Sequence, residues 1–156
     1  MKLSKKLQNF LVYVSVTLAL VLFSFFLRNF LQMYCNKQNF FFFDIDFVKN
    51  TGAAFSLFQT HTDILIVLSV FILAMVVFYV IKHLNSLKPS SLILLSLFCA
   101  GIIGNLAERI ADGFVTDYIR LTFVDFPIFN ISDVFINTAA FLIICNIIFN
   151  NDKQQN

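Results

Sequence analysis

The sequence is short of charged residues, histidine and cysteine, and each shortage argues against a class of protein. Only 13% of its 156 residues are charged, about half the share that is typical of a soluble globular domain. Its two histidines lie in separate segments without a His-rich motif, so we expect neither a metal centre nor a bound cofactor. Three cysteines do not support a disulfide framework, and no basic patch supports nucleic-acid binding.

Apolar side chains are what the sequence has in abundance. Hydrophobic residues make up 59% of the chain, 22 residues are phenylalanine, and the mean hydropathy is +0.83. A soluble domain of this length would have to hide most of these side chains, whereas a helix that crosses ~30 Å of hydrocarbon needs about 20 apolar residues. We therefore predict an all-α membrane protein with four transmembrane helices, in one domain over residues 1–156. The predicted spans are approximately residues 10–28, 62–81, 91–109 and 132–149.

A cluster of basic residues, Lys2, Lys5 and Lys6, precedes the first apolar run. That run is too long for a cleaved signal peptide and no small-x-small cleavage site follows it, so we interpret it as a retained anchor. Lysine beside the first span favours a cytoplasmic N-terminus. With four spans, both termini then lie in the cytoplasm and both long loops lie outside.

The loop between the first two spans contains a predicted strand. Residues Phe43–Phe47 alternate apolar with polar side chains, which is typical of a half-buried strand. We predict a small amphipathic β-sheet on the outer face, over approximately residues 39–58, with phenylalanines towards lipid and Asp44 and Asp46 towards water. Residues Ala53–Phe58 are either a returning strand or a segment that dips into the membrane. A disordered aromatic loop is disfavoured because so many phenylalanines need an apolar cover.

Two aspartates, Asp117 and Asp133, lie where apolar segments meet polar loops. Carboxylates are costly there, because ionised groups near hydrocarbon lose solvation. Antiparallel helices would bring the two together at the same depth, where two close carboxylates share one proton. The ionised partner can then take a proton from water while the protonated partner donates to a carbonyl oxygen. This pair predicts an aspartyl protease embedded in the membrane.

Other polar residues share helix faces with the pair. Asn105 and Arg109 are four residues apart, and Asn130, Asp133 and Asn137 follow at spacings of three and four, so each set would lie on one face of its helix. These side chains would hold the carboxylates and position a substrate backbone. Two alternatives stay open: Arg109 extends to the interface from a helix end, and the asparagines only form hydrogen bonds between helices.

Other chemistries fit the sequence less well. A small transporter or proton-conducting protein would also use carboxylates at the membrane rim. It predicts charges deep in the spans, however, and the apolar runs of the first two spans, Phe10–Leu27 and Ile64–Ile81, hold none. An anchoring protein without chemistry would leave the polar cluster unexplained. A Ser–Lys dyad from Ser56 and Lys49, or one using Ser132, would need a desolvated lysine, which nothing in the amphipathic segment indicates.

Four stretches resemble the motifs of the lipoprotein signal peptidases, the bacterial signal peptidase II family. Lys49–Ser56 resembles the family's N-x-G-A-A-F segment, and Gly104–Arg109 resembles G-N-x-x-D-R. Gly113–Ile119 resembles G-x-V-x-D-F/Y-I, and Phe126–Asp133 resembles F-P-x-F-N-x-A-D. The motif order and the four apolar runs agree with this resemblance along the chain.

The resemblance implies a membrane aspartyl endopeptidase of the bacterial plasma (inner) membrane, with four spans and an active site near the outer face. Such an enzyme removes the signal peptide from diacylglyceryl-modified prolipoproteins at the bilayer, cleaving before the lipidated cysteine, and globomycin-type inhibitors block it. Position by position, the catalytic pair maps to Asp117 and Asp133. The family's supporting positions map to Asn50, Gly52, Asn105, Arg109 and Asn130.

Three positions depart from the family pattern. Glu108 stands where aspartate is usual before the arginine, Ser132 where alanine precedes the second aspartate, and Ala139 where glycine is common. Glu108 keeps the charge on a longer side chain, and the other two replace one small residue by another. None of them is an aspartate of the pair, so they bear on the fine geometry of the site and not on its assignment.

Overall fold

Four long helices form the body of the molecule. The computed structural model describes residues 3–35, 37–52 and 61–151. Each helix overlaps one predicted span, and all four are long and apolar enough to cross a membrane. The prediction of a four-helix membrane protein is therefore confirmed. The helices are α1 (Lys5–Tyr34), α2 (Thr62–His83), α3 (Pro89–Asp112) and α4 (Ile131–Asn151).

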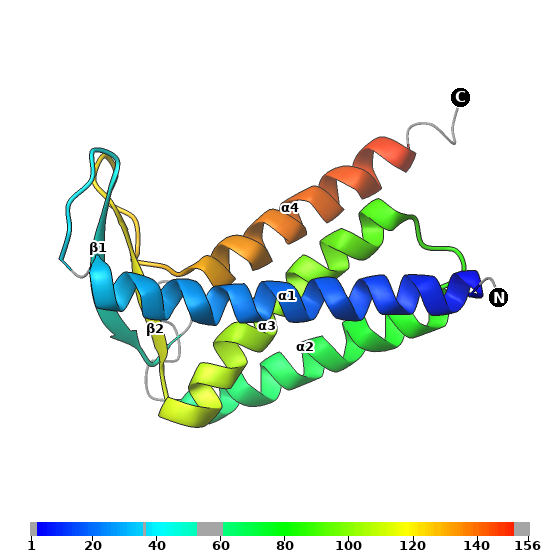
Figure 1. The fold of residues 1–156 in the computed structure, drawn as a ribbon, viewed down its shortest axis with the longest axis horizontal. Helices are drawn as coiled ribbons and strands as arrows, with labels where there is room; N and C mark the ends of the chain where they lie inside the picture. The colour runs from blue at the N-terminus through cyan, green and yellow to red at the C-terminus, as the bar shows by residue number, and fades with distance from the viewer. Residues whose placement is uncertain (1–2, 36, 53–60, 152–156) are drawn as a thin grey trace.

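Helix α3 lies at the centre of the bundle and packs against α1, α2 and α4 (Figure 1). Half of its most apolar window is buried inside the protein, compared with 11–17% for the other three helices, whose exposed apolar side chains suit a lipid environment. Two glycines allow α4 to approach α3 closely. A Cβ on Gly101 would lie 2.5 Å from the carbonyl oxygen of Ser132, and one on Gly104 would collide with the Ser132 hydroxyl. The absence of a side chain at these two positions lets the helices come this close.

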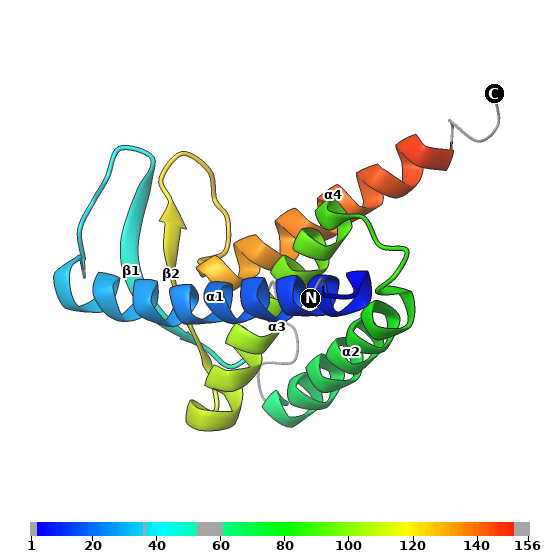
Figure 2. The ribbon, with the colours of Figure 1, turned by 45° about the vertical axis from the view of Figure 1, so that its right-hand side comes forward.

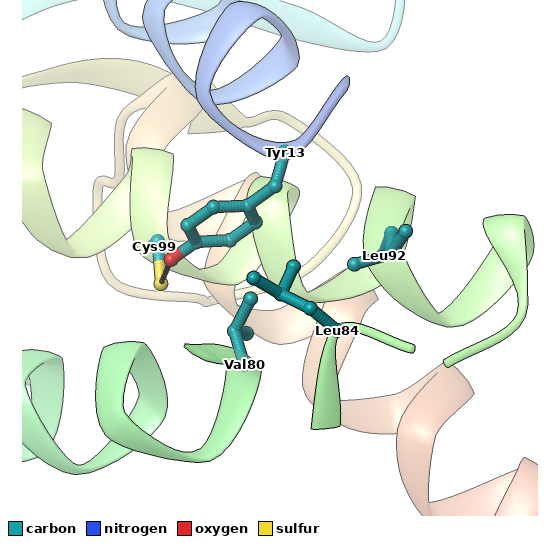
Figure 3. Close-up of a cluster of buried hydrophobic side chains, with 5 residues drawn as sticks. All are labelled: Tyr13, Val80, Leu84, Leu92 and Cys99. Atoms are coloured by element: carbon teal, nitrogen blue, oxygen red, sulfur yellow. Dashed lines mark hydrogen bonds between the residues drawn. The ribbon is translucent and has the colours of Figure 1, made fainter. Parts of the chain in front are cut away.

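A buried apolar cluster joins α1, α2 and α3 near the end of the bundle where α1 begins. Figure 3 shows Tyr13 of α1 beside Val80, Leu84, Leu92 and Cys99, all of them buried. The Tyr13 hydroxyl donates to the Cys99 Sγ over 3.1 Å, which satisfies the one polar atom that this tyrosine brings into the apolar cluster.

The two strands lie across the opposite end of the bundle. Strands β1 (Phe43–Asn50) and β2 (Val115–Leu121) pair antiparallel, and Figures 1 and 2 show them at the end away from the start of α1 and the end of α4. The register pairs Phe43 with Leu121 and Asn50 with Val115, with an irregularity between Ile45 and Val48. The prediction of a small sheet is confirmed.

The partner of β1 was not predicted. We expected either a returning strand or a membrane-dipping segment at Ala53–Phe58, and those residues lie outside the described part of the chain. The observed partner, β2, follows α3 directly. Gly113 makes this possible: its φ of 80° ends α3 in the left-handed conformation, and its N–H donates to the Arg109 carbonyl over 3.1 Å. The chain then reverses into Val115, so that Asp117 belongs to a strand and not to a loop.

Candidate active site

Asp117 is fixed by the sheet. Its carboxylate is buried, only 3% of the residue being exposed. Asp117 pairs with Val48, and Asn50 pairs with Val115, which makes Asn50 and Asp117 diagonal neighbours on one face of the sheet. The Asn50 Nδ2 donates to the Asp117 Oδ2 over 2.8 Å. The strand pairing thus brings together two polar residues that are 67 positions apart in the sequence.

Asp133 is fixed by the start of α4. Asn130 precedes the helix, and its Oδ1 accepts from the Asp133 N–H over 3.0 Å. In return, the Asp133 Oδ2 accepts from the Asn130 N–H over 3.1 Å. This reciprocal arrangement is a capping box, which satisfies N–H groups that a helix start leaves without partners. We predicted Asn130 on a helix face, and this is wrong, since Asn130 is the residue that caps the helix.

A continuous amide network joins the two carboxylates. The Asn130 Nδ2 donates to the Asp117 Oδ1 over 2.9 Å and to the Asn105 Oδ1 over 3.1 Å. The Asn105 Nδ2 donates to the Asp133 Oδ1 over 2.7 Å. Each carboxylate therefore accepts two hydrogen bonds, and Asn130 contacts both. Asn105 and Asn130 do form hydrogen bonds between elements, as one alternative held, and their acceptors include both carboxylates.

The surroundings of Asp117 raise its pKa. Burial is the largest cause and the charge of Asp133 acts in the same direction, so that with all its neighbours the pKa is about 6, compared with the ordinary value of 3.8. The hydrogen bonds from Asn50 and Asn130 and the charge of Arg109 lower this pKa, because they stabilise the carboxylate. The balance leaves Asp117 able to change protonation state under mildly acidic to neutral conditions, as a general acid or base requires.

Arg109 shapes the rim of the site without a hydrogen bond to either aspartate. Its Nη2 donates to the Gly52 carbonyl over 2.8 Å, and the Gly52 N–H donates to the Asn50 Oδ1 over 2.9 Å. Arg109 thereby fixes the backbone that orients Asn50. Its Nε is buried and has no hydrogen-bond partner among the described residues.

One predicted site residue lies elsewhere. The structure brings together Asp117, Asp133 and the supporting residues Asn50, Gly52, Asn105, Arg109 and Asn130. Asn137 is exposed on α4 and makes no hydrogen bond within the described part of the chain. Its spacing from Asp133 suits a shared face, but a shared face does not by itself supply a hydrogen-bond partner.

Two further contacts at the site were missed by the sequence analysis. The Tyr118 hydroxyl accepts from the Ile131 N–H over 3.2 Å and so ties β2 to the start of α4. The Glu108 Oε2 accepts from the Thr116 N–H over 2.7 Å. A signal for Glu108 was present, since an acid in the last turn of an apolar span needs a partner. Strand β2 had not been recognised, so no partner for Glu108 could be named.

The fold and the site together define a multi-pass membrane protein with a polar site at one end of its helices. A family model described as signal peptidase (SPase) II matches residues 16–149. The chain therefore belongs to the signal peptidase II family.

Individual relatives are similar to this chain over part of their length. A lipoprotein signal peptidase of Dehalococcoides mccartyi is 50% identical over 95 residues, which cover 59% of this chain and 58% of the relative. One of Streptococcus thermophilus is 36% identical over 103 residues, covering 65% and 66%. One of Fusobacterium nucleatum is 34% identical over 114 residues, covering 73% and 69%. The chain thus spans less than two thirds of the length of the first two relatives.

Two solved structures share the fold. Both are described as bacterial membrane enzymes. One has a TM-score of 0.80 at 24% identity and covers 90% of each chain. The other has a TM-score of 0.74 at 25% identity and covers 86% of this chain and 91% of that one.

Proposed function

We propose that this protein is a membrane aspartyl endopeptidase that removes signal peptides from diacylglyceryl-modified prolipoproteins. Asp117 and Asp133 would be its catalytic pair, and cleavage would fall just before the lipidated cysteine. The observation that carries this proposal is the amide network, in which Asn130 contacts both carboxylates and Asn50 and Asn105 each contact one. Relatives named lipoprotein signal peptidase support the substrate class.

The pair would hydrolyse the peptide bond without a covalent intermediate. With one proton on the pair, the ionised carboxylate takes a proton from a water molecule as that water attacks the scissile carbonyl carbon. The protonated carboxyl donates to the carbonyl oxygen and so stabilises the tetrahedral intermediate. When the intermediate collapses, the proton taken from water passes to the leaving nitrogen. The high pKa of Asp117, about 6, keeps the required proton available.

The polar neighbours would keep the two carboxyl groups in place. Asn105 and Asn130 hold Asp133 and Asp117 at fixed positions, and Asn50 holds Asp117 from the sheet. Arg109 and Gly52 would form the rim where the substrate backbone enters. Fixed geometry of this kind lowers the entropic cost of reaching the transition state.

The position of the site suits a lipid-modified substrate. Asp133 lies in the first turn of α4 and Asp117 lies five residues beyond α3, so both lie where the spans end. A diacylglyceryl group would stay in the bilayer while its peptide reaches this depth. We place the protein in the bacterial plasma membrane as one domain, with both termini cytoplasmic and the site near the outer face. Globomycin-type inhibitors would compete at the same site.

Aromatic side chains at the tip of the sheet would seat it on the bilayer. Phe41 is 87% exposed and Phe42 62%, and Phe42 contacts Phe123, itself 69% exposed. Aromatic rings favour the interface between lipid and water. Charged residues at Phe41 and Phe43 are expected to weaken membrane seating and turnover together. Unchanged seating and turnover would contradict this role.

The substrate assignment is tested with purified protein in bilayers. We expect cleavage of a peptide that carries a diacylglyceryl cysteine, with mass spectrometry placing the cut before that cysteine. The same peptide with an unmodified cysteine is the control and should be cleaved far more slowly. Equal cleavage of both peptides would contradict the substrate class, and cleavage of neither would contradict the proposed function.

A further inference from the structure

Strand β2 carries Asp117, and the edge of β2 that faces away from β1 would be open without a second anchor. The N–H groups of an edge strand need partners. The Tyr118 N–H finds one in the Phe129 carbonyl, over 3.0 Å. The Thr116 N–H, next to Asp117, finds its partner in a side chain, the Glu108 carboxylate of α3, over 2.7 Å. A hydrogen bond to a charged acceptor is shorter and stronger than one between neutral groups.

Glu108 is in turn held by α1. The Arg28 Nη1 lies 3.2 Å from the Glu108 Oε2, the oxygen that also accepts from Thr116. Glu108 is only 9% exposed, so its charge is removed from most of the solvent and depends on these two partners. Arg28 and Glu108 therefore connect α1, α3 and β2 at a point one residue away from Asp117.

We propose that Arg28 and Glu108 form a positioning clamp that fixes the edge of β2 and thereby sets where the Asp117 carboxylate lies against Asp133. This inference rests on the proposed function, since it assigns the clamp a role in the same reaction. Neither residue hydrogen-bonds to a carboxylate of the pair among the described contacts, so both act through the strand backbone. The clamp acts on the strand from the helix side, whereas Asn50 and Asn130 hold the carboxylate itself.

The clamp has a signature that differs from simple destabilisation. The groups that face Asp117 are Asp133 and Asn130 from the start of α4, Arg109 from α3 and Asn50 from β1. If β2 moves outward, Asp117 gains solvent and moves away from the charge of Asp133, and both changes lower its pKa. Loss of the clamp should therefore lower kcat and move the pH profile, with little change in KM. Loss of a residue that only stabilises the fold would reduce the yield of folded protein and leave kcat and the pH profile of the folded fraction unchanged.

The test compares variants in proteoliposomes with a lipidated peptide as substrate. Because Arg28 is one-fifth exposed, Arg28→Gln is the variant most compatible with folding, and we expect kcat to fall about tenfold with KM changed less than about threefold. Glu108→Ala breaks both contacts and should lower kcat about 100-fold. Glu108→Asp keeps the charge and should recover most of that loss. The limb of the pH profile that reports Asp117 should move to lower pH in the first two variants.

A matched control lies on the same strand. Arg120 forms an exposed ion pair with Asp46 across the sheet, so Arg120→Gln breaks an ion pair of β2 without touching the clamp. Its kcat and pH profile should match the wild type. Hydrogen exchange adds a readout without substrate: the Thr116 amide should exchange faster in Glu108→Ala and not in Arg120→Gln.

The outcomes separate the clamp from the proposed function. A wild-type kcat and pH profile in Arg28→Gln, or in folded Glu108→Ala, would overturn the clamp. If Asp117→Asn is inactive in the same assay, the protease assignment still stands. Substantial turnover by Asp117→Asn would instead overturn the proposed function. A lowered kcat with a shifted pH profile in Arg28→Gln, together with recovery in Glu108→Asp, supports the clamp.

Discussion

The two ends of the helical bundle bury side chains of opposite character, apolar at one end and polar at the other. At the end where α1 begins, Tyr13, Val80 and Cys99 pack as an apolar cluster in which the Tyr13 hydroxyl donates a hydrogen bond to a sulfur atom (Figure 3). At the end that carries the sheet, Asp117 and Asn130 are also buried, but both are polar and hydrogen-bonded. The first arrangement gains free energy from burial. The second pays desolvation for each carboxylate and offsets it with amides.

This difference implies that stability and activity are separable along the bundle. A change in the apolar cluster should alter the unfolding temperature and leave turnover as it was. A change at the end that carries the sheet should alter turnover, and in one case should even stabilise the protein. Substitutions at the two ends test whether stability and turnover change separately.

Among the supporting residues, Asn130→Ala should have the largest effect. It removes the donor to Asp117 and the cap of α4 together, so both carboxylates lose their fixed positions. We expect turnover to fall about 100-fold or more and stability to fall by about 1 kcal/mol, measured by peptide cleavage and thermal unfolding. Asn146→Ala, which removes only a bond to the Leu142 carbonyl of the same helix, is the control and should keep full turnover.

Asp117→Asn should stabilise the protein in a pH-dependent way. The folded-state pKa of about 6 lies above the ordinary value of 3.8, so the folded protein holds this proton more tightly than the unfolded chain. The stability from this proton is present below about pH 4 and is lost as the pH rises to about 6. At pH 7 the ionised, buried carboxylate then costs ~3 kcal/mol, and Asn, which cannot ionise, should recover it. Equal unfolding temperatures of variant and wild type from pH 4 to 7 would contradict this.

Tyr13→Phe should affect stability alone. It removes the hydroxyl that donates to Cys99 and keeps the aromatic ring in the cluster, at a cost of about 1 kcal/mol, or about 2–4 °C in the unfolding temperature. Turnover and its pH profile should be unchanged. A shifted pH profile would mean that the two ends of the bundle are coupled.

Asn137→Ala should have the smallest effect, although the sequence placed this residue at the site. Its side chain is exposed and lies away from the amide network, so we expect stability to change by less than about 0.5 kcal/mol and turnover to stay at the wild-type rate. A turnover loss comparable to that of Asn130→Ala would show that Asn137 contacts the bound substrate.

The sequence predicted the four helices because the evidence for them is local. Apolar runs of the right length leave a helix as the natural structure in lipid. The sheet was only half predictable. Phe43–Phe47 alternates clearly, whereas β2, with Tyr118 buried on one face and Asp117 on the other, shows no alternation.

The site was predicted by residue type and motif, and its geometry was not. Asp117, Asp133 and their asparagines could be named, but Asn130 as a cap and Glu108 as a partner of Thr116 depend on where strands and helix starts meet. Such contacts join residues of different secondary-structure elements, and the spacing of residues along one helix does not predict them. Asn137 shows the converse: its spacing is right, yet it makes no hydrogen bond to the site among the described residues, because correct spacing does not guarantee a partner.

The most direct test of the central claim is the turnover of a lipidated peptide by Asp117→Asn and by Asp133→Asn. Both variants keep the shape of the side chain and remove its acid–base chemistry, so each should insert normally and cleave between about 100-fold and 10,000-fold more slowly than the wild type. Near-normal cleavage by either correctly inserted variant would contradict the carboxylate pair as the catalytic centre.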